Sequence, residues 1–200
     1  MQTIEEYAFL FSNIEEISIP PSVTKICEYA FSKCKNLRKV EIPTNSNLQT
    51  IEEYAFSFSN IEEISFPKSL LELKERWCTG IEKLRRITIS PSNGQFIFKD
   101  DKYLIGKSNQ NDAEFDKLLF VRRDIKEIPI PLNIKIIGSS SFSKSNIKEI
   151  SIPQNVTKIC ERAFFNCKNL RKVEIPTYKQ LKNMHFHFQI SKKFLLHTAW

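Results

Sequence analysis

Two distant stretches of the chain are nearly the same. Residues Ser22–Thr44 have the sequence SVTKICEYAFSKCKNLRKVEIPT, and Asn155–Thr177 have NVTKICERAFFNCKNLRKVEIPT, with nineteen of 23 positions identical. A second pair is Ile4–Pro20, IEEYAFLFSNIEEISIP, and Ile51–Pro67, IEEYAFSFSNIEEISFP. A unit that recurs along a chain predicts a repeat architecture rather than one globular core.

The repeats share the skeleton apolar-x-x-apolar-x-apolar, usually followed by proline. Its last apolar residue recurs after 23, 24, 23, 41, 22 and 23 residues, and the long step indicates an insertion. The seven copies are Ile14, Ile17 and Ile19; Leu37, Val40 and Ile42; Ile61, Ile64 and Phe66; Leu84, Ile87 and Ile89; Ile125, Ile128 and Ile130; Ile147, Ile150 and Ile152; and Leu170, Val173 and Ile175.

Each unit predicts the same local structure. The apolar-x-apolar pair places two side chains on one face of a short strand. A second apolar pair follows, such as Val23 and Ile26, and then an Ala-Phe dipeptide such as Ala30-Phe31, which we expect in a short helical turn. The Phe and Ile positions are therefore assigned to the core. One coil cannot bury them alone, but stacked coils can.

These features predict a leucine-rich-repeat solenoid of the α/β type that is rich in β-structure. We expect a single curved stack of short parallel strands with short helical turns and one inserted β-hairpin or meander. The solenoid would cover residues 1–176 in about seven repeats, with the insertion at about 92–124. Residues 177–200 leave the pattern. They are a basic and aromatic cap, a membrane-surface or partner-binding segment, or a truncated last repeat.

Charge and composition exclude several classes of protein. No run of about 18 apolar residues is present, which argues against a membrane span, and the N-terminus has no signal-peptide pattern. Residues 177–200 hold four lysines and no acid, so the net charge of +7 less these four leaves +3 on residues 1–176. That balance does not supply the clustered basic footprint that nucleic-acid binding needs.

No pattern for catalysis or for a cofactor is present. Cys27 and Cys160 occupy equivalent places in distant repeats, as do Cys34 and Cys167, so we expect all five cysteines to be thiols outside disulfides. Cys-x-x-Cys zinc spacing is absent. His185-x-His187 alone is weak evidence for a metal site. We expect no enzyme activity, cofactor or metal.

The repeat resembles the BspA-like leucine-rich repeats, which occur in surface-antigen proteins of host-associated bacteria and in protist families. Its pattern is L-x-x-L-x-L-P-x-x-L-x-x-I-x-x-x-A-F-x-x-C, and Lys35–Pro67 shows the match at full length. The resemblance covers about residues 4–176. It implies cell adhesion or other protein binding at a cell surface, and no enzyme activity. The absence of a secretion signal and of a membrane anchor is a departure from the family.

In such a stack the strands form one sheet on a concave face, and side chains between the buried positions point into solvent. Their charges alternate on the first four strands, which favours cross-strand ion pairs, each worth about 0.2–1 kcal/mol. We expect partner contacts on the later strands and on the polar loop of the insertion, for which a solvated loop is the alternative. The candidate partner-binding residues are Arg86, Thr88, Lys126, Glu127, Lys148, Glu149, Ser151, Arg171, Lys172, Glu174, Asn111, Asp112 and Glu114.

Three hypotheses for function follow. The first is a surface recognition module that binds a protein, such as a host or extracellular-matrix protein, or a glycan. The second is an intracellular protein-interaction scaffold, suggested by the missing signal and the five cysteines. The third is a truncated repeat fragment without function. The sequence alone leaves the location open between the cell surface and the cytoplasm.

Overall fold

The computed structural model describes residues 2–175 and 195–198. The chain divides into two compact units, unit 1 at Met1–Asp101 and unit 2 at Lys102–Trp200. Both units consist of short strands and turns, and the described ranges contain no helix. Among those same residues there is accordingly no helix suited to crossing a bilayer. The predicted fold class, a solenoid of stacked parallel strands, is confirmed.

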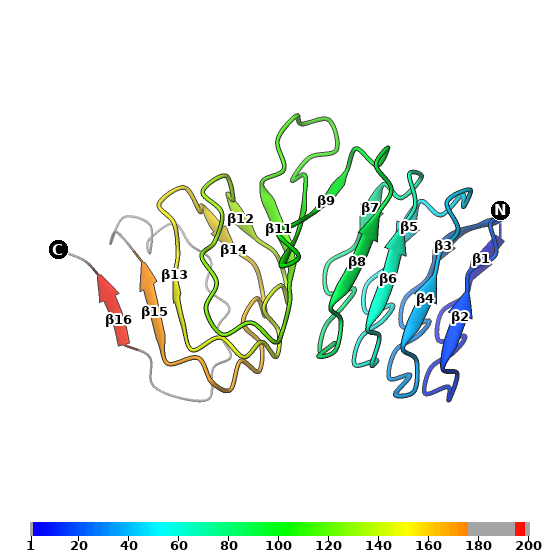
Figure 1. Ribbon diagram of the computed structural model, residues 1–200, viewed down its shortest axis with the longest axis horizontal. Coiled ribbons are helices and arrows are strands. Elements are labelled where there is room, and N and C mark those ends of the chain that lie inside the picture. The colour runs from blue at the N-terminus through cyan, green and yellow to red at the C-terminus, as the bar shows by residue number, and fades with distance from the viewer. Residues whose placement is uncertain (1, 176–194, 199–200) are drawn as a thin grey trace. The chain divides into compact units, whose positions relative to one another are not determined.

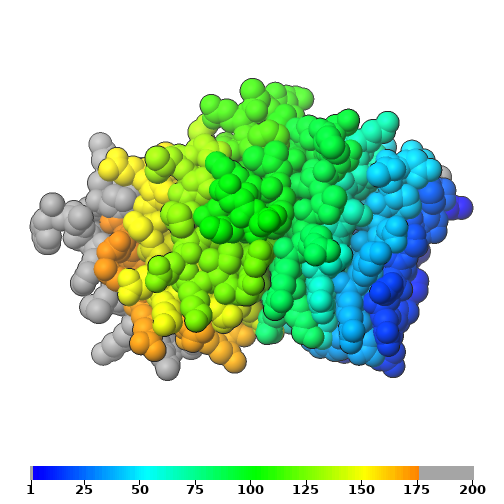
Figure 2. All heavy atoms as spheres, in the orientation of Figure 1, coloured from blue at the N-terminus to red at the C-terminus, as the bar shows by residue number. Residues whose placement is uncertain are grey.

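Unit 1 carries two parallel four-stranded sheets, in the orders β1-β3-β5-β7 and β2-β4-β6-β8 (Figure 1). Each coil gives one strand to each sheet, so successive coils lie as successive bands of colour in the space-filling view (Figure 2). Unit 1 ends in β9 (Phe96–Lys99). The strands of the two sheets are β1 (Gln2–Ile4), β3 (Val23–Ile26), β5 (Thr50–Ile51) and β7 (Glu72–Leu73), then β2 (Glu16–Ser18), β4 (Lys39–Glu41), β6 (Glu63–Phe66) and β8 (Arg86–Ile89).

Unit 2 begins with the antiparallel hairpin of β10 (Tyr103–Gly106) and β11 (Lys117–Val121). The parallel pattern then resumes, because β11 pairs with β12 (Ile136–Ile137), and β12 with β14 (Lys158–Ile159). The other sheet has the order β13-β15-β16. Its strands are β13 (Glu149–Ser151), β15 (Lys172–Ile175) and β16 (Leu195–Thr198).

The alternation of side chains along each strand builds the core. In β4 and β6, Val40 and Ile64 are 1% and 3% exposed, and their neighbours Lys39 and Glu41 face solvent. Behind the strands runs a column of aromatic rings, in which Phe9 stacks on Phe31 at 5.0 Å between ring centroids. The column continues through Phe56 and ends edge-on against Trp77. Rings from successive coils therefore bury one another, as expected for a quasi-one-dimensional core.

The turns that carry Ala-Phe are not helical. Each contains two residues with positive φ, four apart, and a left-handed residue interrupts a right-handed helix. The N–H groups between them alternate: Ala8 donates to Glu5 O within the turn, whereas Phe9 donates to Ala30 O in the next coil at 2.8 Å. These hydrogen bonds between coils replace those of a helix. The left-handed pairs are Tyr7 and Phe11, Tyr29 and Lys33, Tyr54 and Phe58, Arg76 and Gly80, Ser140 and Lys144, and Arg162 and Asn166.

Two local expectations are wrong. The copy at Ile125, Ile128 and Ile130 forms no strand, although Ile128 and Ile130 are buried. Pro129 lies inside it and has no N–H to donate to a neighbouring strand. Phe11 was assigned to the core with the other Phe positions, but it is 62% exposed on a turn.

The cysteines lie largely as expected. None of the five, all of which are in the described part of the chain, forms a disulfide. Cys34 and Cys167 are buried at equivalent places, and each thiol donates to a carbonyl of the preceding coil at 2.9 Å. The predictions for the tail, the His185-x-His187 pair included, fall on residues outside those described, apart from β16.

Candidate binding surfaces

The strands of unit 1 bring the predicted charge ladder into register. Glu16 lies beside Lys39, Lys39 beside Glu63, and Glu63 beside Arg86. Arg86 Nη1 lies 2.5 Å from Glu63 Oε1 and forms a cross-strand ion pair. Lys39 pairs instead with Glu41 of its own strand, at 3.4 Å. Exposed pairs of this kind contribute about 0–1 kcal/mol, so this surface is a mixed-charge sheet with weak internal pairing.

Arg86 and Thr88 are the two candidate residues in unit 1, both on β8. Thr88 is exposed and lies beside Ser65 of β6. The side chain of Arg86 is 69% exposed, although it contacts Glu63. Such an arginine can exchange its partner for a carboxylate of another protein at small cost.

Unit 2 places three candidate cations on consecutive coils. Lys148 N donates to Lys126 O at 3.3 Å, and Arg171 N donates to Lys148 O at 2.7 Å. We call Lys126, Lys148 and Arg171 the basic column. All three are exposed, and no acidic side chain of the described ranges forms an ion pair with any of them. The same backbone bonds in unit 1 join residues of alternating charge, namely Glu15, Arg38, Glu62 and Arg85.

The next position along each coil of unit 2 has a different charge pattern. Glu127 and Glu149 are exposed, and Lys172 lies beside Glu149 in the register of β13 and β15. Lys172 Nζ is 2.6 Å from Glu174 Oε1, and this hydrogen bond, with the charges of Glu174 and Glu149, raises the pKa of Lys172. Ser151 is exposed beside Glu174. We call these residues and the basic column together the strand face of unit 2, although Lys126 and Glu127 lie in the copy without a strand, and Lys148 and Arg171 directly precede β13 and β15.

The inserted loop between β10 and β11 carries the other candidates. Asn111, Asp112 and Glu114 are exposed. Below them, the buried carboxylate of Asp116 accepts hydrogen bonds from the N–H of Ser108 at 2.9 Å and from its hydroxyl at 3.0 Å. These hydrogen bonds join the start of the loop to its end. They fix the base of the loop, and its tip remains exposed.

Glu114 of this loop also reaches the next coil. Lys135 Nζ lies 2.9 Å from Glu114 Oε2, and this hydrogen bond is the main reason that the pKa of Lys135 is raised. The loop is therefore connected to the repeat stack through an exposed ion pair, whose contribution to stability is small. We treat the inserted loop and the basic column as two separate candidate surfaces.

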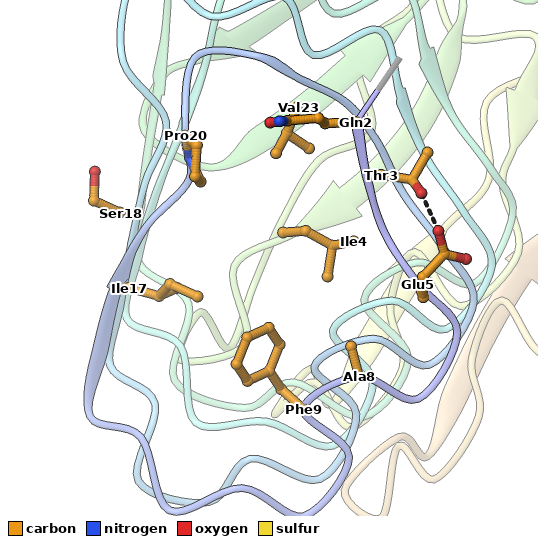
Figure 3. Close-up of a pocket in the computed structure, with 10 residues that line it drawn as sticks. All are labelled: Gln2, Thr3, Ile4, Glu5, Ala8, Phe9, Ile17, Ser18, Pro20 and Val23. Atoms are coloured by element: carbon orange, nitrogen blue, oxygen red, sulfur yellow. Dashed lines mark hydrogen bonds between the residues drawn. The ribbon is translucent and has the colours of Figure 1, made fainter.

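A hollow of about 690 Å³ lies at the first coil of unit 1 (Figure 3). Its apolar walls include Ile4, Phe9, Ile17 and Val23, which point into it. The equivalent positions of the next coils are buried in the core. The hollow is therefore lined by the same repeat positions that form the core of the following coils. Across the described ranges, no group of three or more His, Cys, Asp or Glu side chains could hold a metal ion.

One surface feature was missed in the sequence. Tyr7, Tyr29 and Tyr54 stack face to face on the turns of unit 1, with ring centroids 5.2 Å and 4.9 Å apart and planes within 8°. Tyr7 is 52% exposed. We call these three residues the tyrosine column. The recurring Glu-Tyr-Ala-Phe segment is the sequence signal for this column, because it places a tyrosine at the same turn position in successive coils.

A buried arginine in unit 2 was missed as well. Arg123 is 2% exposed, donates hydrogen bonds to the carbonyls of Ser140 and Ser141, and lies over the Phe120 ring at 4.5 Å. A buried cation that is satisfied by carbonyl groups has a structural role here, because it ties the hairpin to the following coil.

Comparison with known proteins identifies the repeat. The model of the "BspA type Leucine rich repeat region" matches residues 2–103 and 113–195, in six copies. No curated protein sequence matches the chain. Families of leucine-rich repeats are generally protein-binding modules rather than enzymes, so the match indicates a role in protein interaction or recognition.

Solved structures show the same architecture. The crystal structure of the pneumococcal vaccine antigen PcpA superposes with a TM-score of 0.75 at 26% identity, over 87% of this chain and 44% of PcpA. A leucine-rich cell surface protein of Faecalibacterium prausnitzii gives a TM-score of 0.57 at 22% identity, over 82% of this chain and 54% of that protein. The latter likeness shows the fold alone. The chain thus spans less than two thirds of the length of either protein.

Proposed function

Because the chain belongs to the BspA-type leucine-rich-repeat family, we propose that it is a recognition module for adhesion at a cell surface, with a protein as its partner. The contacts are made by the strand face of unit 2 and by the inserted loop. Arg86 and Thr88, on β8 of unit 1, are a separate candidate contact surface. The similarity to PcpA supports the surface location, because a vaccine antigen has to be reachable by antibodies.

The observation that carries this proposal is the basic column. Backbone hydrogen bonds join Lys126, Lys148 and Arg171 on consecutive coils, so the three like charges lie close together and repel one another. In unit 1 the same positions alternate in sign and avoid that repulsion. A row of exposed cations that form no ion pair with the described acidic residues lowers the stability of the fold, and binding of a partner's carboxylates relieves this repulsion. Complementary charge also increases the association rate.

The neighbouring acids favour a protein over a polyanion. Glu127 and Glu149 follow Lys126 and Lys148 directly in the chain and are exposed beside them. A sulfated glycan or a nucleic acid presents uniform negative charge, which these carboxylates repel. A protein segment with both acidic and basic side chains can satisfy both positions.

The inserted loop supports the same role. Its tip exposes two amide or carboxylate side chains, Asn111 and Asp112, above a base fixed by Asp116. A loop that is already ordered loses little conformational entropy when it binds. It can therefore add hydrogen bonds to an interface whose charge pairs are individually weak.

An intracellular scaffold is the second candidate, and the cysteines are the observation that favours it. Five thiols without a disulfide are typical of proteins from reducing compartments. Antibody staining of intact and of permeabilised cells separates the two functions. Staining of intact cells supports surface adhesion, whereas staining only after permeabilisation rejects adhesion and favours the scaffold.

Binding is tested with the purified full chain on a panel of extracellular-matrix proteins and glycans. We expect a matrix protein to bind, with affinity that falls as salt rises, and we expect K126A/K148A/R171A to lose at least tenfold in affinity. The control K68A/K83A/K99A removes the same charge from exposed sites of unit 1 and should bind like the wild type. Equal losses in both variants, or binding to sulfated glycans alone, would reject the proposed site.

A further inference from the structure

The solvent side of the sheet β2-β4-β6-β8 in unit 1 carries charged doublets whose sign alternates from coil to coil. The first residue of each strand is charged, and so is the residue directly before the strand. The two residues of one coil have the same sign, and the next coil has the opposite sign. We call these residues the alternating face, and they are Glu15 and Glu16, Arg38 and Lys39, Glu62 and Glu63, and Arg85 and Arg86.

The alternating face is open to solvent along the side of the stack. Glu63 is half-exposed and the other members of the face are exposed. Figure 1 shows the four strands that carry it side by side, and the backbone register places each doublet beside the next. Coils of a solenoid contact their neighbours only along the stacking direction. An additional coil would therefore lengthen this face without covering it.

Pairing within the chain leaves most of these charges unused. Arg86 pairs with Glu63, and Lys39 pairs with Glu41 of its own strand. The other members of the face form no ion pair within the described part of the chain, namely Glu15, Glu16, Arg38, Glu62 and Arg85. Cross-strand ion pairs alone therefore do not account for the alternation.

The repeat does not require the alternation either. At the equivalent positions of unit 2, Lys126, Lys148 and Arg171 put three cations on consecutive coils, joined by the same backbone hydrogen bonds. The fold thus accepts like charges on neighbouring coils. The alternating signs of unit 1 instead suit a partner with the same spacing and the opposite order of charges.

We propose that this partner is a second copy of the chain, bound face to face with its coils in reversed order. A two-fold axis parallel to the strands, between β4 and β6, relates the two copies and makes the contact isologous. Each doublet then meets a doublet of opposite sign in the other copy. The facing doublets are Glu15 and Glu16 with Arg85 and Arg86, and Arg38 and Lys39 with Glu62 and Glu63, each contact occurring twice.

The order of signs selects this arrangement among face-to-face dimers. A two-fold axis along the stacking direction would place every coil opposite the same coil of the second copy, so each doublet would meet its own sign. A shift of the antiparallel copies by one coil also brings like signs together. A shift by two coils leaves half of the doublets without a partner. Full overlap around the axis between β4 and β6 is the arrangement that uses every doublet.

The other outward positions of these strands are compatible with the dimer. Ser18 faces Thr88 of the second copy, and Glu41 faces Ser65, so no like charges meet. Exposed ion pairs are individually weak and are screened by salt, so the dimer should be reversible and salt-sensitive. The dimer goes beyond the proposed recognition function, because it uses unit 1 and assigns Arg86 and Thr88 to contact with a second copy.

Sedimentation velocity of the full chain tests the dimer. We expect dimers at about 100 μM protein in about 0.05 M salt, and monomers in about 0.5 M salt. R85E/R86E should weaken dimerisation at least about tenfold, because two acidic doublets then face each other. E15R/E16R should do the same through two facing basic doublets.

The charge swap E15R/E16R/R85E/R86E should restore the dimer to within about threefold of the wild-type affinity, because opposite signs face each other again. Within one stack its signs run plus, plus, minus, minus. Restored pairing inside the chain therefore cannot explain the rescue. An equimolar mixture of R85E/R86E and E15R/E16R should likewise form a heterodimer, although neither variant dimerises alone.

The matched control is K68E/K99E, which makes the same change in net charge at exposed positions outside the alternating face and should dimerise like the wild type. The circular dichroism spectrum of each variant checks that it is folded. A monomeric wild type in low salt, a dimer insensitive to R85E/R86E, equal losses in K68E/K99E, or absence of rescue in the charge swap would overturn the proposal. None of these variants alters the basic column, so a failure here leaves the adhesion site untouched.

Discussion

Gly80 lies directly against the ring of Phe58. A Cβ atom built on Gly80 would come within 2.5 Å of both Cδ1 and Cε1 of Phe58. Gly80 also has a φ of +73°, at the turn position where Phe58 has a φ of 56° in the preceding coil. Other coils have non-glycine residues with positive φ at the equivalent turn position, so the left-handed conformation alone does not require glycine. Glycine is needed at position 80 because the ring of Phe58 lies so close to it.

Gly80→Ala should therefore destabilise the chain by about 1–3 kcal/mol, from the left-handed conformation and the displaced ring together. Urea unfolding followed by circular dichroism measures the change. Gly94→Ala is the control, because nothing lies within 4 Å of its added Cβ, and it should change stability by less than about 0.5 kcal/mol. In the Phe58→Ala background, Gly80→Ala should cost less than in the wild type. Equal costs in the two backgrounds would show that the ring contact is unimportant.

Asn93 holds the turn that precedes β9 in unit 1. Its amide nitrogen donates to Pro67 O at 2.8 Å and to Leu70 O at 2.9 Å, and its amide oxygen accepts from the N–H groups of Gln95 and Phe96. Asn93→Ala leaves these groups without partners and should cost about 2–4 kcal/mol. The exposed Asn45→Ala should be neutral within about 0.5 kcal/mol. Hydrogen exchange of the Gln95 and Phe96 amides measures the local effect, and unchanged protection in Asn93→Ala would contradict the prediction.

Arg123 should be the most sensitive arginine of unit 2. Arg123→Ala removes hydrogen bonds to two carbonyls, removes the contact with Phe120 and leaves a cavity, so we expect a loss of about 3 kcal/mol or more. Arg123→Lys should lose less than Arg123→Ala, because it keeps the charge but cannot bond both carbonyls in the same geometry. Arg122, which pairs with Asp124 and is half-exposed, provides the matched control. Arg122→Ala should lose at most about 1 kcal/mol in the same denaturation experiment. Similar losses for Arg122→Ala and Arg123→Ala would refute the role assigned to burial.

The exposed ion pair between Glu63 and Arg86 should contribute little to the free energy of unfolding. A double-mutant cycle with Glu63→Gln and Arg86→Gln should give a coupling energy of about 0.2–1 kcal/mol that decreases as salt is added. A coupling well above 1 kcal/mol that is insensitive to salt would mean that the ion-pair ladder is a main determinant of strand register.

Stability should fall in alkaline solution partly through Cys34 and Cys167. Burial raises the pKa of both thiols above the ordinary value of 9.0. The folded state thus favours the protonated thiol, and its contribution is complete below pH 9 and is lost as pH rises toward the higher folded pKa values. C34S/C167S keeps a donor at both sites but does not titrate there. Its free energy of unfolding should fall less steeply above pH 9 than that of the wild type, and parallel slopes would exclude the thiols as a cause.

The strands were predictable because their signal is local. Residues such as Val40 and Ile64 alternate with charged neighbours, and that alternation alone assigns them to the buried face. The turns were not predictable, since Tyr7 and Phe11 are residue types that rarely adopt positive φ. Their conformation is stabilised by hydrogen bonds to residues 28–32 of the next coil, a non-local cause.

The candidate surfaces were also predictable only where the signal lies in the local sequence. The exposure of Lys126 and Lys148 followed from the repeat pattern, but whether either lysine pairs with one of the described acidic residues depends on where those residues lie in space. The burial of Arg123 could not be predicted, because local sequence assigns a charged residue to the surface. Pro129 had a usable signal, and its missing N–H should have excluded a strand at that copy.

The hydrogen bonds between coils give the molecule a direction of mechanical weakness. In unit 1 they run from each coil to the next, along the stacking direction of the sheets (Figure 1). A pull along that direction loads the junctions between coils in series, so the weakest junction opens first and the coils separate one after another. A protein built in this way lengthens under tension by releasing single coils, and each release dissipates energy.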